Sequence, residues 1–138
     1  MAQSTSQTGG QTRQLLTATN LAVSVPAAGT TTLLEVPTAG IDTMGLSFDV
    51  TVQALDAFAI TARFNADSAF VTLYSTAGSF TTPAGLLIGA SGDLTTQAAG
   101  TTGWFVLYTR GLHSVKVTCS ANVAGAATVS VYAGGAGN

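Results

Sequence analysis

The sequence predicts an all-β protein, a single-domain antiparallel β-sandwich or jelly-roll-like barrel of about eight or nine short strands with an extended N-terminal arm. Three observations predict this class. Short apolar runs alternate with turn-rich gaps at even spacing along the 138 residues. Threonine is abundant and 16 glycines are present, which favours strands joined by turns. No stretch shows a sustained helical period with caps, so one sandwich or barrel domain accounts for the chain.

Residues 1–14 are expected to form a flexible or extended arm. They contain no apolar side chain larger than alanine except Met1, so they add little to a core. An extended arm of this length reaches roughly 45 Å, far enough to lie across a neighbouring molecule. A disordered terminus is the alternative interpretation.

Residues 15–133 are expected to form the β domain, and residues 134–138 a Gly-rich C-terminal tail. Clusters of Gly, Pro, Asn, Asp and Ser separate the apolar runs, as expected of turns between strands. The runs that indicate strands are LLTATNLAVSV, TTTLLEV, MGLSFDVTVQ, FAITARF, AFVTLYS, GLLIGA, GWFVLYTR, HSVKVTC and ATVSVYA.

Two neighbouring runs alternate regularly enough to predict how they pair. Residues 46–53 and 58–64 each place apolar side chains on one face and mostly polar ones on the other. If the two runs form a hairpin, the register that keeps the apolar rows together sets Asp49 against Arg63. Such a pair would be a surface contact worth at most about 1 kcal/mol and not a catalytic dyad.

The stretch GLHSVKVTCS holds the chain's only histidine, His113, its only lysine, Lys116, and its only cysteine, Cys119. A helix would bring the three together, but the apolar residues alternate with polar ones in the period of a strand. In a strand, His113 and Cys119 lie about 20 Å apart and Lys116 points to the opposite side. We therefore interpret the segment as a core strand and not as a nucleophilic or zinc site.

Two runs, AFVTLYS and GWFVLYTR, are apolar or aromatic on both faces. A two-layer sandwich buries one face of each sheet, so the second row needs cover from a loop, the arm or another chain. Cover by the connection from Gly92 to Gly103 is one possibility, and an intermolecular surface is the other, because aromatic residues concentrate at interfaces. The residues expected at such an interface are Phe70, Tyr74, Phe105 and Leu107 and, in the arm, Gln11 and Arg13.

Reactive side chains are few and form no catalytic pattern. The chain has six acidic residues, one histidine and one cysteine. The run GASGD at Gly89 to Asp93 departs from the Gly-x-Ser-x-Gly elbow, and no glycine-rich loop is followed by Lys and Ser or Thr. No series of spaced acids suggests a calcium loop. We therefore expect no enzymatic activity, no catalytic or metal-binding residues and no cofactor.

The charge pattern argues against nucleic acid and membranes as partners. Charged residues make up 7% of the chain, against about 25% in average soluble domains. The net charge is −2 and the four basic residues are scattered, so no basic patch is expected. No run approaches the roughly 20 apolar residues of a membrane span, and MAQSTSQTGGQTRQ does not resemble a secretory signal. We expect a protein folded in a cytoplasm that binds neither nucleic acid nor membrane.

The polar arm, the nearly uncharged Thr/Ala/Gly-rich β domain, the run GWFVLYTRGLHSVKVTCSAN and the ending VSVYAGGAGN together resemble small structural proteins of tailed-bacteriophage virions, especially head decoration or cement proteins. The resemblance implies a homo-oligomer that binds the major capsid protein or other virion proteins and bridges neighbouring subunits. It also implies a location in the virion, which is assembled in the host cell cytoplasm.

Two alternatives remain open at this point. A tail, neck or fibre component needs the same repeating, low-charge β interfaces. A carbohydrate-binding or adhesive β-sandwich belongs to another class, and its aromatic residues would stack on sugar rings. The candidates for that role are Trp104, Tyr74, Tyr108 and Tyr132.

Overall fold

The computed structural model describes residues 2–8, 11–53, 55–75, 87–90, 101–121 and 125–137, and these form ten strands. Within these ranges no helix is long and apolar enough to span a membrane. The strands, in chain order, are β1 (Ala2–Thr8), β2 (Gln11–Val25), β3 (Thr31–Pro37), β4 (Thr43–Thr51), β5 (Leu55–Arg63), β6 (Val71–Ser75), β7 (Leu87–Ala90), β8 (Thr101–Tyr108), β9 (Ser114–Ala121) and β10 (Ala127–Gly137).

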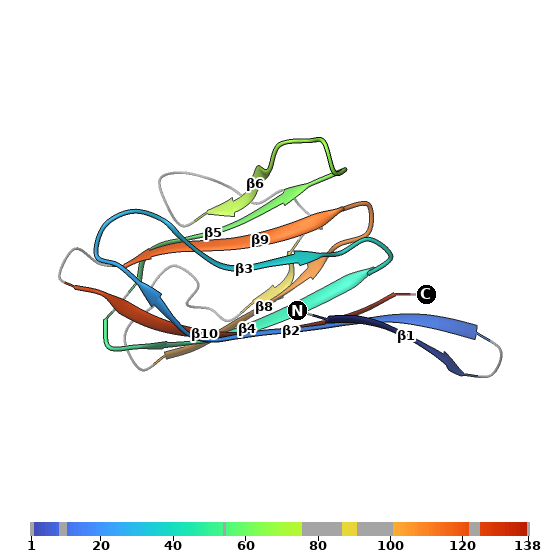
Figure 1. Ribbon diagram of the computed structural model, residues 1–138, viewed down its shortest axis with the longest axis horizontal. Coiled ribbons are helices and arrows are strands. Elements are labelled where there is room, and N and C mark those ends of the chain that lie inside the picture. The colour runs from blue at the N-terminus through green and yellow to red at the C-terminus, as the bar shows by residue number, and fades with distance from the viewer. Residues whose placement is uncertain are drawn as a thin grey trace.

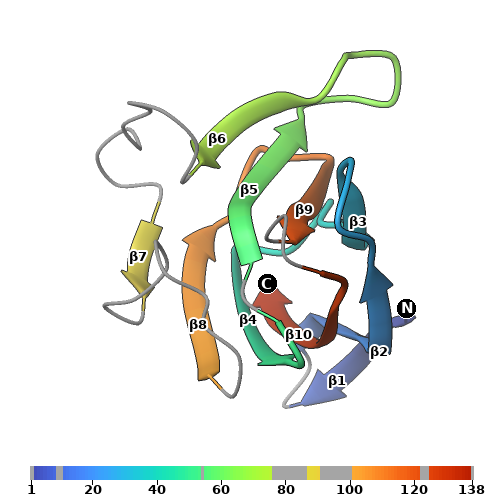
Figure 2. The same cartoon turned by 90° about the vertical axis from the view of Figure 1, so that its left-hand side faces the viewer.

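The strands form two packed sheets, which confirms the predicted all-β antiparallel sandwich. One sheet has six strands in the order β1-β2-β10-β4-β8-β7, and the other has four in the order β3-β9-β5-β6. All pairings are antiparallel. Figures 1 and 2 show the two layers facing each other, with the four-stranded sheet above the six-stranded one.

The core lies between the sheets and consists of the apolar rows that the alternation predicts. On β4, every second residue from Met44 to Val50 is buried, and on β9 the buried apolar residues are Val115, Val117 and Cys119. Three aromatic rings join the layers. Phe58 of β5 lies with its ring centroid 5.0 Å from that of Phe48 and 6.1 Å from that of Phe105. Offset and edge-to-face rings at these distances attract one another beyond the effect of burial alone.

The predicted hairpin between residues 46–53 and 58–64 is wrong, because β4 and β5 belong to different sheets. Asp49 does not meet Arg63, and its carboxylate accepts a hydrogen bond of 2.8 Å from Thr102 instead. A tight turn at the end of β4, in which Gln53 N–H donates to the Thr51 carbonyl, leads the chain away from the six-stranded sheet. Two apolar rows are buried equally well as neighbours within one sheet or as opposing faces of a sandwich. Alternation alone therefore cannot show which of the two arrangements a pair of strands adopts.

A bulge in β2 explains why LLTATNLAVSV does not alternate cleanly. Leu16 and Ala18 are buried before the bulge and Val25 after it, so the buried positions change from even to odd numbers. Ala22 has a φ of 52°, and its N–H donates to the Ser130 hydroxyl at 3.0 Å because the ladder cannot satisfy it.

Both ends of the chain continue into the six-stranded sheet. The residues expected as an arm form β1 and the start of β2, which pair with each other from Ala2 and Thr17 to Thr8 and Gln11. Residues 134–137, expected as a tail, are the last part of β10; all four pair with β2, and residues 134–136 also pair with β4. Glycine is required at this end of β10, because a Cβ at Gly137 would meet the Gly40 carbonyl oxygen.

Candidate functional site

Two of the residues predicted at an intermolecular interface are in the core. Phe105 and Leu107 are buried, because β8 pairs with β4 in a register that sets them beside Leu46 and Met44. The exposed row of β8 is the opposite one. Alternation shows that a strand has two apolar rows, but it does not show which row faces inward, so the interface assignment of Phe105 and Leu107 is corrected.

The other predicted interface residues lie in three different places. Phe70 is half-buried, and Tyr74 packs against the edge of the core, where burial raises the pKa of its phenol above the usual value. Gln11 and Arg13 belong to β2, and their side chains lie outside the part of the chain that the structure describes. The same holds for residues 92–100 of the connection considered as cover for the aromatic rows.

Among the described residues, the outer surface of the six-stranded sheet carries three exposed aromatic side chains, which we call the outer aromatic face: Trp104, Tyr108 and Tyr132. Their exposed fractions are 45%, 52% and 43%. Ser47 of β4 is the register partner of both Trp104 and Tyr132, so these two rings flank one hydroxyl two strands apart. Trp104 and Tyr108 lie on the same side of β8, four residues apart.

The middle of the outer aromatic face contains glycines, which have no side chain, and it is uncharged. Gly45 pairs with Gly134 on one side and with Val106 on the other, so two glycines lie between the row of Trp104 and the row of Tyr108. Among the described side chains of the central strands β10, β4 and β8, the single charged group is Asp49, which is hydrogen-bonded to Thr102. The face therefore suits a neutral partner that contacts rings and hydroxyls.

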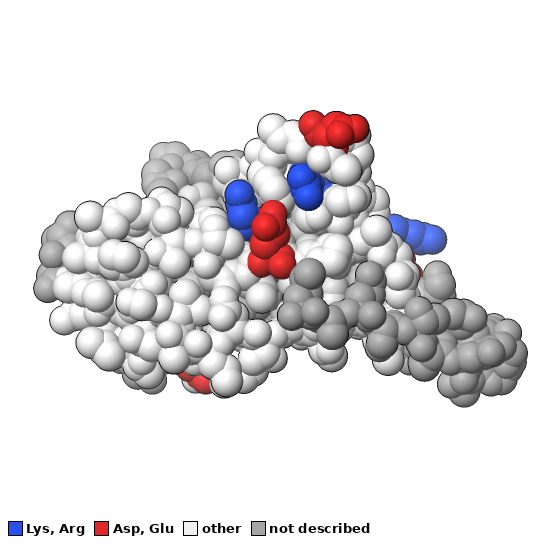
Figure 3. Space-filling view, in the orientation of Figure 1, with Lys and Arg blue, Asp and Glu red and all other residues white. Residues whose placement is uncertain are grey.

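The outer surface of the four-stranded sheet is different, because charged residues gather there (Figure 3). A pocket of about 250 Å³, which we call the His113 pocket, is lined by Glu35, Pro37, Arg63, His113 and Ser114. The pairing of β9 with its neighbours produces this cluster. It sets Ser114 beside Pro37 and Arg63, and in the next row it sets Lys116 beside Glu35.

A His–Ser contact lies in this pocket, and sequence reasoning missed it. His113 Nδ1 is 2.9 Å from the Ser114 hydroxyl. Nucleophilic catalysis by such a pair needs an accessible hydroxyl and a third group that orients the imidazole. Ser114 is only 4% exposed, and within the described residues no side chain hydrogen-bonds to the other ring nitrogen of His113. The contact positions the imidazole at the pocket wall, and no described side chain supplies the orienting group of a catalytic triad.

Two of the basic side chains of this surface pack against the Phe70 ring. Lys116 Nζ lies 4.1 Å from the ring centroid, and the guanidinium carbon of Arg63 lies 5.1 Å from it. Cation–π contacts of this kind restrain long side chains that would otherwise move freely. No pattern in the sequence could have indicated the contact, because residues 63, 70 and 116 meet only through the pairing of β5 with β9.

Cys119 is a core residue, as the sequence predicted. It is buried, and burial raises the pKa of its thiol to about 12, because the thiolate would lose its hydration. A thiol that remains protonated is neither a nucleophile nor a metal ligand. Within the described ranges, no group of three or more His, Cys, Asp and Glu residues is placed to hold a metal ion.

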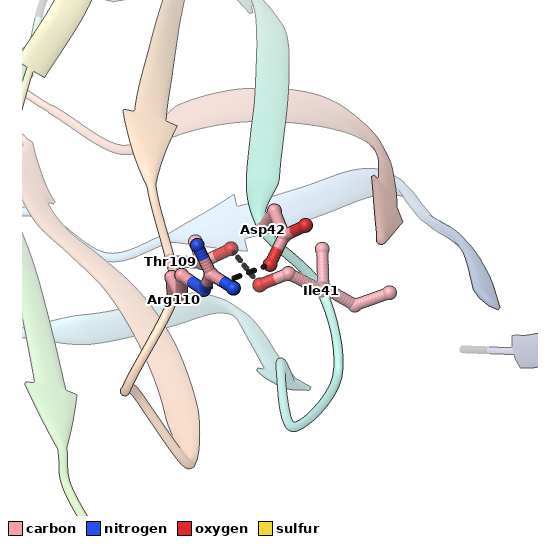
Figure 4. Close-up of polar contacts among 4 residues, drawn as sticks. All are labelled: Ile41, Asp42, Thr109 and Arg110. Carbon is pink, nitrogen blue, oxygen red and sulfur yellow. Dashed lines mark hydrogen bonds and ion pairs between the residues drawn. The ribbon is translucent and has the colours of Figure 1, made fainter. Parts of the chain in front are cut away.

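The remaining basic residue with a described side chain is Arg110, at the far end of β8 (Figure 4). Its Nε lies 3.7 Å from an Asp42 carboxylate oxygen, and both side chains are well exposed. Beside this pair, the Thr109 hydroxyl donates a buried hydrogen bond of 2.7 Å to the Ile41 carbonyl. This group ties the end of β8 to the start of β4, so it has a structural role.

Neither a protein-family model nor a curated protein sequence matches the chain. Two solved structures are similar to it in fold. One is the SPBc2 prophage-derived protein YomS, with 12% identity, a TM-score of 0.49 and coverage of 88% of this chain and 94% of YomS. The other is a structure of the infectious bursal disease virus Gx strain, with 16% identity, a TM-score of 0.44 and coverage of 90% of this chain and 32% of that one.

Proposed function

We propose that this chain is a non-enzymatic structural protein of a virion, a head decoration or cement protein that binds capsid subunits as a homo-oligomer. The observation that carries the proposal is the outer aromatic face, where Trp104, Tyr108 and Tyr132 are half-exposed on a surface almost without charge. Trp and Tyr concentrate at the centres of protein interfaces, where they supply large contact area at a low cost in conformational entropy. The resemblance in composition and in the quoted segments to virion structural proteins suggests the class of partner.

The size of the face supports a contact made by more than one element. The strands β2, β10, β4 and β8 present a flat area of roughly 500 Å² at ordinary strand spacing. A stable interface buries about 800 Å² on each partner. The hairpin of β1 and β2 continues the same sheet, so it extends the surface toward the required area.

The mechanism is stabilisation by mass action. Each copy that binds the assembled shell and not the free subunits shifts the equilibrium toward the shell. Because the face has almost no charge, its contacts depend on apolar burial and hydrogen bonds, and added salt screens them little.

Substitution on the face tests the proposal. We expect Tyr108→Ser and Tyr132→Ser each to weaken binding to phage heads by at least about tenfold, as measured by co-sedimentation and electron microscopy. Phe64→Ser is the matched control, because Phe64 is 58% exposed but directly follows β5, a strand of the other sheet. Binding that is unchanged by both face substitutions, or absent in the wild type, would reject the proposal.

The same face supports one alternative from another class, a carbohydrate-binding or adhesive module. Its rings lie beside hydroxyls, since Ser47 separates Trp104 from Tyr132 and Thr19 pairs with Tyr132. A protein that binds glycans through these rings and binds no particle would establish this alternative. A tail, neck or fibre protein would be recognised by binding to tails and not to heads.

A further inference from the structure

We propose that the His113 pocket binds a carboxylate group. The inference stands apart from the proposed function, because it concerns the outer surface of the other sheet. The carboxylate can belong to a small organic acid or to an acidic side chain of a neighbouring protein, since both present the same two oxygens to the pocket.

The first argument is that donors converge on a cavity of suitable size. The pocket of about 250 Å³ is lined by Arg63, His113 and Ser114. When Ser114 donates to His113 Nδ1, the neutral imidazole carries its proton on Nε2, which can then donate to a carboxylate oxygen. The main chain holds the group in place, because His113 N–H donates to the Arg63 carbonyl at 2.8 Å.

The second argument is an unsatisfied donor on Arg63. Its Nη1 donates to the Ala66 carbonyl at 3.2 Å, whereas its Nε is buried and has no hydrogen-bond partner among the described residues. Buried donors in native proteins are nearly always paired. A small rotation of the Arg63 guanidinium that turns Nε–H toward the pocket would therefore gain a hydrogen bond when an acceptor binds there. A carboxylate is the acceptor whose planar pair of oxygens best matches a guanidinium.

The third argument is the charge of the cluster. Arg63 and Glu35 line the pocket with opposite charges, and Lys116 lies beside Glu35 in the adjoining row, so these three residues carry one net positive charge in a chain whose net charge is −2. The other described basic side chain, Arg110, is already beside Asp42. One positive charge matches a carboxylate, whereas a phosphate dianion would bring a second negative charge close to Glu35.

The two basic side chains are also held in place before any ligand arrives. Both lie against the Phe70 ring, Lys116 Nζ at 4.1 Å and the guanidinium carbon of Arg63 at 5.1 Å from its centroid. A restrained donor loses less entropy on binding than a mobile one, so the ring strengthens binding.

Because His113 is the only histidine in the chain, its imidazole C–H signals report on the pocket without ambiguity. The full-length protein is titrated with sodium acetate at constant pH and ionic strength, with chloride as the balancing salt and inorganic phosphate in a parallel series. We expect a saturable shift of the His113 signals with acetate and a weaker response to phosphate. No saturable shift with acetate, or tighter binding of phosphate, would overturn the proposal.

Two substitutions are expected to change the affinity for acetate in opposite directions. We expect Arg63→Gln to weaken acetate binding by about tenfold and Glu35→Gln to tighten it by about threefold. Arg110→Gln, which removes a distant exposed arginine, should leave binding unchanged. If Arg63→Gln fails to fold, Lys116→Gln replaces it as the substitution that is expected to weaken acetate binding. The same affinity in the wild type, Glu35→Gln and Lys116→Gln would show that these charges do not form a site.

A measurement of binding to phage heads distinguishes the two sources of the carboxylate. This part of the test rests on the proposed function. If Arg63→Gln weakens binding to phage heads as well as to acetate, the carboxylate belongs to a capsid partner. If it weakens acetate binding and leaves head binding unchanged, the ligand is a small acid. A wild-type protein that binds acetate and no particle would reject the proposed function and leave the carboxylate site standing.

Discussion

At the scale of single residues, Cys119 shows how burial controls chemistry. Its thiol has a pKa of about 12 in the folded protein, raised from its ordinary value by desolvation. Below the pKa that the thiol has in the unfolded chain, both the folded and the unfolded state bind the proton. The contribution of the thiol to the free energy of unfolding is therefore complete in this pH range. Above that pH the unfolded chain releases the proton and the folded chain keeps it.

We therefore expect the free energy of unfolding to fall by up to about 1.4 kcal/mol per pH unit as the pH rises from about 9 toward about 12. Denaturant titrations of the wild type and of Cys119→Ala across this range measure the effect. The variant should be about 1 kcal/mol less stable at neutral pH, because it leaves a small cavity, and it should lack the thiol's share of the decline. Equal slopes for the two proteins would contradict this assignment.

The character of individual residues could be predicted from the sequence where local alternation decides it. Alternation predicted Cys119 as a core residue, and it predicted that Lys116 would point away from the buried row. It could not predict the contact of Lys116 and Arg63 with Phe70, because that contact requires the register of β5 against β9. The His113 pocket was missed for the same reason, since Glu35 reaches it from β3.

At the scale of the strands, glycine positions show how closely neighbouring strands are packed. Gly103 of β8 is the register partner of Phe48 on β4, and the Phe48 ring lies where a Cβ on Gly103 would be. The ring cannot move aside easily, because it is fully buried and contacts Phe58. Gly103 therefore makes room for one of the rings that join the two sheets.

We expect Gly103→Ala to lower the free energy of unfolding by about 1–3 kcal/mol, because the added methyl group displaces a packed ring. Gly45→Ala on the adjacent strand is the matched control. Its Cβ would have no neighbour closer than 3.8 Å, so it should be neutral or slightly stabilising. Thermal and urea unfolding of both variants measure the difference. Similar stabilities would mean that Phe48 has another rotamer available.

The positions of the strands were predictable, whereas their partners were not. Nine of the ten strands, β2 to β10, fall on the nine apolar runs that the sequence indicates, from LLTATNLAVSV in β2 to ATVSVYA in β10. Assigning β4 and β5 to one hairpin failed, because the pairing of apolar rows is the same within a sheet and across a sandwich. The pairing of β1 with β2 could not be predicted either, since AQSTSQT has no apolar row to define a buried face.

At the scale of the whole molecule, the two outer surfaces are unlike each other. One sheet presents aromatic rings with little charge, and the other presents the charged cluster around Phe70. Composition alone could not separate them, because it reports only that charges are few. Under the two proposals made above, one surface contacts a neutral protein partner and the other holds a carboxylate.

The hairpin of β1 and β2 reaches beyond the sandwich in Figure 1, and β1 pairs with β2 alone. Removing residues 1–10 therefore takes away β1 and leaves the pairing of β2 with β10 in place. We expect the truncated protein to melt within about 2 °C of the full-length chain, because every described core residue lies at position 16 or beyond and is retained. Its binding to phage heads should weaken, since the hairpin extends the contact surface. Calorimetry and co-sedimentation of the same preparation measure both effects. A large fall in melting temperature would assign β1 to the stability of the domain, and unchanged binding would show that it takes no part in the contact.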